Sequence, residues 1–152
     1  MDALDIIEIH QLLGRYGHSI DARDWAAFAA LFEADAVLDY TEVRAPHVLH
    51  GIEEIVAWFR DANHPSAHHV TNIVVDEVDG PAGREVRVHS KFFAPSTRES
   101  HSPKRWFGGD YHDVVARGAD GRWRFVSKRC VGRWQFTPDE PGVDVPDHSR
   151  TF

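Results

Sequence analysis

The chain is poor in cysteine and in basic residues. Its one cysteine, Cys130, excludes an internal disulfide and supplies no cysteine pair for a metal. This scarcity predicts a reducing, cytoplasmic environment. Lys and Arg number 17 against 24 Asp and Glu, for a net charge of −7, and no Lys/Arg run forms a basic patch. That balance argues against a nucleic-acid partner.

Long hydrophobic runs are also missing. No stretch of about 18 apolar residues occurs, so we expect no membrane span and no membrane partner. The first residues, Met1-Asp2-Ala3-Leu4-Asp5, lack the basic and apolar regions of a signal peptide. The 11 histidines are scattered, and no His-Glu-x-x-His pair or nucleotide-binding fingerprint occurs. We therefore predict neither a metal site nor a cofactor.

What the chain does have is enough apolar material for one core. Hydrophobic residues make up 42% of its 152 residues, with nine Phe and five Trp. This length suits a single domain. We predict one domain over residues 1–152, with its core at about 4–137. The range 138–152 holds three prolines and no periodicity, so it is predicted to be a C-terminal extension.

Helical periodicity occupies the first part of the chain. Apolar residues at three- and four-residue steps predict a helix over 4–20. A second, shorter helix is predicted over 25–32, with Asp24 as its N-cap, and a third over 51–59.

The first helix contains two glycines, Gly14 and Gly17. Each weakens a helix by up to about 1 kcal/mol relative to alanine. Their presence indicates that another segment packs closely against this helix.

After the third helix the period changes from 3.6 to 2, as in β-strands. The order, helices first and long hairpins afterwards, is typical of an α+β fold with the helices on one face of a sheet. The strands are predicted over 36–40, 67–78, 84–93, 104–117 and 122–136, with a further short one possible at 48–49.

Asp21 lies where the first helical pattern ends, beside apolar neighbours, so its carboxylate needs solvent or a partner. The candidate partner is His69, in the segment His68-His69-Val70-Thr71-Asn72. A histidine whose other ring nitrogen is held by a carboxylate can act as a general base near neutral pH. Alternatively, Asp21 caps a helix and His69 is an ordinary strand residue. From the sequence by itself, the second interpretation is favoured.

Arg129 and Arg133 follow Trp123 and Phe125 at a period of two along the last strand. If no bulge intervenes, both arginines share the covered face with this aromatic pair. An inward arginine requires a counter-charge or an anionic ligand. Alternatively, the end of the strand projects beyond the helices and the arginines reach solvent.

Several aromatic side chains are candidates for a pocket. Tyr16 lies about one turn before Asp21, where its hydroxyl could reach a cavity, although core tyrosines are commoner. Large aromatic residues belong to the core by default. The candidate substrate-binding residues are Trp58, Phe92, Trp106, His112 and Trp134.

Three segments together resemble one family. They are Ile20-Asp21-Ala22-Arg23-Asp24-Trp25, His68-His69-Val70-Thr71-Asn72 and Asp120-Gly121-Arg122-Trp123-Arg124-Phe125. In order and spacing they resemble the nuclear transport factor 2-like superfamily, and most of all its SnoaL-like group. That group includes scytalone dehydratase, hexachlorocyclohexane dehydrochlorinase and bile acid 7α-dehydratase.

The resemblance implies a cone-shaped, curved, mixed but mostly antiparallel sheet wrapped around three helices, with a pocket inside. It implies that Asp21 and His69 form a dyad that removes a proton beside the leaving group. Tyr16 would then donate to the leaving oxygen or hold the substrate, and Arg129 or Arg133 would stabilise negative charge.

On this basis the chain is predicted to be a cofactor-independent lyase of the dehydratase type. Its partner would be a small or medium-sized apolar, cyclic substrate, and it would form a homo-oligomer, a dimer or trimer. Two alternatives stay open. One is a polyketide cyclase or isomerase that uses the same dyad, and the other is a non-catalytic ligand-binding or dimerisation module.

Overall fold

The structure is a computed structural model that describes residues 1–43, 45–62, 64–65, 67–80, 83–95 and 105–137. The predicted C-terminal extension at 138–152 and most of the loop before the predicted strand 104–117 lie outside these ranges.

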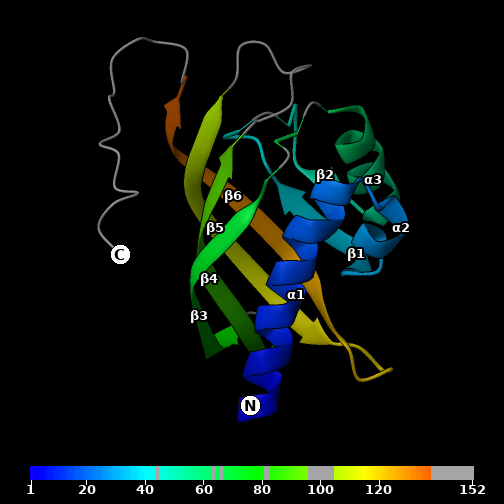
Figure 1. Cartoon of the computed structure of the whole chain (residues 1–152). Helices are drawn as coiled ribbons and strands as arrows, with labels where there is room; N and C mark the ends of the chain where they lie inside the picture. Colours follow the sequence, from blue (N-terminus) through cyan, green and yellow to red (C-terminus); the bar gives the residue numbers. More distant parts are fainter. Residues whose placement is uncertain (44, 63, 66, 81–82, 96–104, 138–152) are drawn as a thin grey trace, which may run out of the picture.

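Within these ranges, three helices and six strands follow one another in the predicted α+β order, and the fold class is confirmed (Figure 1). The short second helix ends at Ala29, so the first strand begins earlier than predicted. The elements are α1 (Ala3–Ala22), α2 (Trp25–Ala29), β1 (Phe32–Asp39), β2 (Leu49–His50), α3 (Ile52–Asp61), β3 (His69–Gly80), β4 (Gly83–Pro95), β5 (Trp106–Arg117) and β6 (Trp123–Phe136).

The six strands form one sheet in the order β2-β1-β6-β5-β4-β3. Every neighbouring pair is antiparallel except β1 and β6, which run parallel. The sheet is therefore mixed and mostly antiparallel, as predicted. Figure 1 shows α1 lying across the curved sheet, with α2 and α3 beside β1 and β2.

The sheet has an inner face, covered by the helices, and an outer face. Side chains alternate between the two along each strand. Inner-face side chains and the apolar stripe of α1 together form one core cluster, because burying both surfaces removes them from water. The inner-face members of this cluster include Val88, Phe92, Tyr111, Val115 and Phe125.

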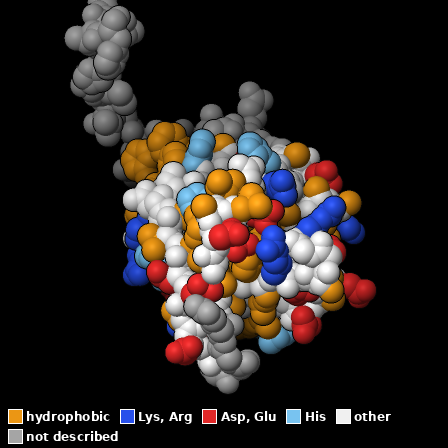
Figure 2. All heavy atoms as spheres, turned by 90° about the horizontal axis from the view of Figure 1, so that it is seen from below, with side chains coloured by type: hydrophobic (Ala, Val, Ile, Leu, Met, Phe, Trp, Pro, Cys, Tyr) orange, Lys and Arg blue, Asp and Glu red, His pale blue; other side chains and the backbone are white. Residues whose placement is uncertain are grey.

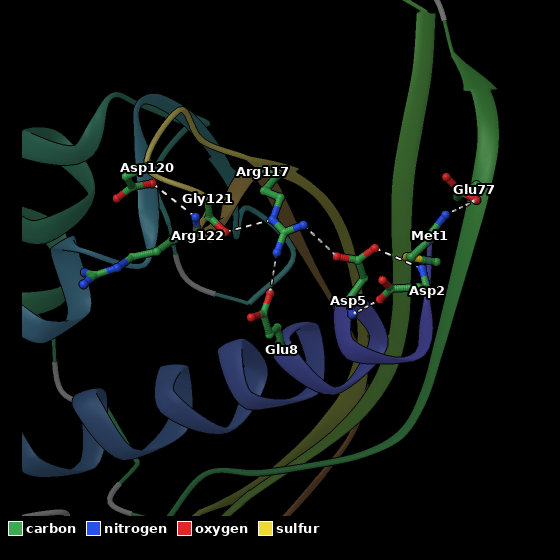
Figure 3. Close-up of polar contacts among 9 residues, drawn as sticks. All are labelled: Met1, Asp2, Asp5, Glu8, Glu77, Arg117, Asp120, Gly121 and Arg122. Carbon is green, nitrogen blue, oxygen red and sulfur yellow. Dashed lines mark hydrogen bonds and ion pairs between the residues drawn. The ribbon is translucent and has the colours of Figure 1, made fainter.

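The N-terminal end of α1 is attached to the sheet by charged contacts (Figure 3). Asp2 caps the helix by accepting a hydrogen bond from the Asp5 backbone N–H at 2.9 Å. Arg117, on β5, lies 3.1 Å from the carboxylates of both Asp5 and Glu8. These contacts fix the direction of α1 across the sheet, and with it the position of its far end.

Acidic and basic side chains are interspersed over the end of the molecule seen in Figure 2. Within the described ranges, no helix has the length and hydrophobicity that a membrane span needs.

Candidate functional site

The far end of α1 carries Asp21, and a histidine from the segment before β3 closes on it. That histidine is His68. Its Nδ1 lies 2.6 Å from Asp21 Oδ1, and its backbone N–H donates to Asp21 Oδ2 at 2.9 Å. Because an ionised carboxylate only accepts, Nδ1 carries a proton in this contact, and in the neutral ring the lone pair is then on Nε2. The contact has the geometry of a histidine base with its orienting carboxylate.

The predicted partner of Asp21 was wrong by one residue. His69 is the first residue of β3 and pairs with Phe93 of β4, where its ring stacks on the Phe93 ring with centroids 5.9 Å apart. Its neighbour Val70 packs against the core, so alternation turns His69 to the outer face. His68 precedes the strand and is free of this alternation.

Asp21 is charged under ordinary conditions. Partial burial acts to raise its pKa, but hydrogen bonds from the His68 ring and backbone, and the nearby Arg23 guanidinium, outweigh burial and hold the pKa below its ordinary value. Arg23 also donates to the carbonyl of Ile20 at 3.1 Å and to that of His64 at 3.0 Å. It thereby ties the segment that leads to His68 to the end of α1.

A mostly apolar cavity of about 80 Å³ adjoins His68. Two of the predicted substrate-binding residues, Trp58 and Phe92, line it, as does Tyr16. Other lining residues are Tyr40, Val43, Phe59, Ala62, His64, Pro65, Ala94, Phe107, Tyr111 and Cys130.

Three phenols share a wall of this cavity. The hydroxyls of Tyr16 and Tyr40 are 2.5 Å apart, and the Tyr40 and Tyr111 rings stack with centroids 6.2 Å apart. Burial raises the pKa of all three hydroxyls well above the ordinary value. They therefore stay protonated and can donate hydrogen bonds, which suits them to hold an oxygen atom of a ligand. We name Tyr16, Tyr40 and Tyr111 the phenol cluster.

The expectation that Arg129 and Arg133 point inward is wrong. Between Phe125 and Ser127 the pairing of β6 with β5 shifts, which leaves Val126 as a β-bulge. One extra residue reverses the alternation of the residues that follow, as far as Gly132. Lys128 therefore occupies the inner face. A second shift, between Gly132 and Trp134, leaves Arg133 as an extra residue itself.

On the outer face both arginines find acidic partners and remain exposed. Arg129 donates to Glu42 at 2.7 Å, and Arg133 donates to Asp110 at 2.7 Å. Arg133 helps to hold the pKa of Asp110 well below its ordinary value, together with Lys91 and against burial of the carboxyl. The two arginines are thus separated from the cavity by the sheet.

Three of the predicted substrate-binding residues also lie away from the cavity. Trp106 and Trp134 each contact Phe93 on the outer face, with ring centroids 5.7 Å apart in both cases. His112 stacks on His89 at 4.7 Å. Their predicted place in the pocket is wrong, because all three side chains lie on the outer face of the sheet.

Sequence reasoning missed a buried ion pair behind the phenol cluster. Lys128 Nζ donates to Asp113 Oδ2 at 2.9 Å and Oδ1 at 3.1 Å, and their side chains are 1% and 0% exposed. Burial lowers the pKa of Lys128 and raises that of Asp113, while their mutual attraction opposes both shifts. The pair could not be predicted from the sequence, because Lys128 faces inward only as a result of the bulge, and no local sequence pattern indicates that bulge.

The described residues contain no group of three or more His, Cys, Asp or Glu side chains placed to hold a metal ion. Cys130 lines the cavity, but burial raises the pKa of its thiol to about 12, so the reactive thiolate is disfavoured.

Comparison with known proteins defines the class. Residues 1–129 match the SnoaL-like domain family. The chain belongs to this family, and the resemblance predicted from the sequence is confirmed. No protein of curated function matches the chain in sequence.

Solved structures show the same fold at low identity. A candidate scytalone dehydratase from Novosphingobium aromaticivorans is 20% identical, with a TM-score of 0.70, covering 88% of this chain and 87% of the other. ActVI-ORFA from Streptomyces coelicolor is 20% identical, with a TM-score of 0.63, covering 84% and 96%. A cystatin-like protein of unknown function from Nostoc punctiforme is 20% identical, with a TM-score of 0.68, covering 88% and 94%.

Proposed function

We propose that the chain is an acid–base enzyme of the lyase class, which eliminates water from a small cyclic substrate. His68 is the general base and Asp21 its orienting carboxylate. The observation that carries the proposal is the His68 ring, held by Asp21 on Nδ1 and lining a cavity that the phenol cluster also lines.

In this proposal His68 Nε2 removes the proton next to the leaving group. The electron pair left on that carbon forms the new double bond as the carbon–oxygen bond breaks. The imidazolium then gives its proton to the departing hydroxyl, which leaves as water. The carboxylate of Asp21 stabilises the imidazolium that forms. The phenol cluster donates to the substrate oxygen on which negative charge develops, and Tyr16 is the member nearest in sequence to the dyad. Base catalysis of this kind contributes roughly 10²- to 10⁴-fold, so orientation within the cavity supplies a further part of the acceleration.

The size of the cavity favours a small substrate. Its volume is about 80 Å³. Typical ligand sites span about 300–1,000 Å³. We infer that the reacting end of a single-ring β-hydroxy ketone enters the cavity. The ketone oxygen would accept hydrogen bonds from the phenols.

The test uses a panel of small cyclic β-hydroxy ketones, with products followed by mass spectrometry. Loss of one water identifies a dehydratase, and an unchanged mass identifies an isomerase or cyclase. We expect His68→Ala to lose at least 10²-fold in rate. Asp21→Asn should lose a comparable factor, because its amide donates toward Nδ1 and imposes the wrong tautomer.

The matched control is His69→Ala, which removes the neighbouring histidine from the outer face and should leave the rate unchanged. A wild-type rate in folded His68→Ala would remove the dyad from the mechanism. Stoichiometric binding of the panel without turnover would instead support the non-catalytic binding module. The predicted homo-oligomer stays a prediction, which light scattering on the full chain measures.

A further inference from the structure

Behind the phenol cluster, on the side away from the cavity, lies the ion pair Lys128–Asp113. Lys128 Nζ is 3.7 Å from the centroid of the Tyr111 ring and 4.4 Å from that of Tyr16. It is also 4.8 Å from the Phe125 ring. The ammonium is therefore enclosed by aromatic faces on one side and by the Asp113 carboxylate on the other.

An ion pair in this place is not needed for packing. Burying two charges carries a desolvation penalty of several kcal/mol per ion, and apolar pairs of similar volume are often equally or more stable. Lys128 Nζ contacts both carboxylate oxygens of Asp113, so the pair is well formed. What an apolar pair would not supply is an ammonium held against the faces of two phenol rings. The Asp113 carboxylate acts on the same two phenols in the opposite sense, raising their pKa.

We infer that Lys128, fixed by Asp113, is a positioning residue that strengthens the phenol cluster as a hydrogen-bond donor toward an anionic oxygen in the cavity. The electron density of a phenol oxygen rises as it donates to an oxyanion, and an ammonium over the ring face stabilises that density. In a site with little water this charge acts over a longer range than it would in solution. The inference rests on the proposed function, because an enolate-like oxygen is the anion that this function places there.

The probes are phenol and 3,5-difluorophenol, which have similar volumes but different acidities. The wild-type chain should bind the more acidic probe more tightly, as measured by calorimetry. Lys128→Met strands the Asp113 carboxylate and threatens the fold, so the principal variant is Lys128→Met/Asp113→Val. This variant removes both charges at nearly constant volume. We expect the preference for the acidic probe, measured as the ratio of the two dissociation constants, to fall roughly tenfold in this variant.

The matched control is Arg129→Met, which removes a cation one residue further along β6 but on the outer face. It should keep the full preference. A second measurement exploits the composition: the chain has three tyrosines, and all belong to the phenol cluster. Labelling with 3-fluorotyrosine therefore places every fluorine resonance in the site. The double variant should shift the resonances of Tyr111 and Tyr16, and Arg129→Met should leave them in place.

A folded double variant with wild-type preference and unshifted resonances would overturn the inference, as would a wild-type chain that does not prefer the acidic probe. The proposed function fails by a different result. If folded His68→Ala keeps the wild-type turnover while the double variant loses its preference, the dyad is wrong and the role of Lys128 stands. If His68→Ala is inactive and the double variant keeps its preference, the dyad stands and the role of Lys128 is wrong.

Discussion

The close approach of His68 to α1 can be tested by adding a single methyl group. A Cβ built on Gly17 would lie 3.1 Å from the His68 carbonyl oxygen and 3.4 Å from His68 Cβ. At Gly14, one turn earlier, no described atom outside the helix comes within 4 Å of such a Cβ. Gly17→Ala and Gly14→Ala thus make the same chemical change in one helix, the first beside a neighbouring segment and the second without one.

The expected magnitudes follow from helix propensity and contact. Replacing a helical glycine by alanine stabilises by about 1 kcal/mol where there is space. Gly14→Ala should therefore raise the free energy of unfolding by about that amount, or the melting temperature by about 2–4 °C. At Gly17 the backbone of His68 is fixed by its hydrogen bond to Asp21 and cannot recede without loss. We therefore expect Gly17→Ala to leave the free energy of unfolding unchanged or to lower it.

The assay is denaturant unfolding of both variants beside the wild type, with turnover measured in parallel. Gly17→Ala should also lower the rate, because a shift of a few tenths of an ångström in His68 disturbs its alignment with the substrate. Gly14→Ala should retain the rate. Equal stabilisation by both substitutions, with full activity in each, would refute the packing of His68 against α1.

Three further predictions concern the same site. Asp21 has a lowered pKa in the folded state, so its contribution to stability is present above the unfolded carboxyl pKa and is lost as pH falls through the folded one. The difference in the free energy of unfolding between wild type and Asp21→Asn should therefore shrink toward acid pH. A difference that grows there would contradict this prediction. Tyr16→Phe should destabilise by about 1–3 kcal/mol, because the buried Tyr40 hydroxyl loses its partner, and adding Tyr40→Phe should recover part of the loss in thermal unfolding. Arg23→Gln should release the His64 carbonyl and speed hydrogen exchange around His68, with unchanged exchange arguing against the tether.

Much of the fold was predictable because its signals are local. The apolar stripe of α1, the N-cap at Asp24 and the alternation of the later strands each depend on residues a few positions apart. Asp24 does accept a hydrogen bond from the Ala27 backbone at 3.0 Å, as an N-cap should. Of the two helical glycines, Gly17 lies beside the apolar stripe and meets another segment, whereas Gly14 is exposed and a Cβ there would meet no described neighbour within 4 Å.

The site was harder to predict because it depends on register. Choosing between His68 and His69 requires knowing that β3 begins at His69 and that Val70 faces the core. The direction of Arg129 depends on a bulge at Val126, which arises from pairing with β5 rather than from the local sequence. One residue of register decides which cation is buried, and Lys128 took the place that period two had given to Arg129.

The parallel pairing of β1 with β6 has a consequence for how the site comes into being. Phe32 lies opposite Phe125, so the first strand of the sheet finds its central neighbour only in the last one. Contacts so distant in sequence are made late, since a long loop must close before they contribute. The phenol cluster draws its members from α1, the end of β1 and β5, and Lys128 behind it comes from β6. During synthesis, Asp21 and His68 therefore emerge well before the strands that complete the cavity are paired.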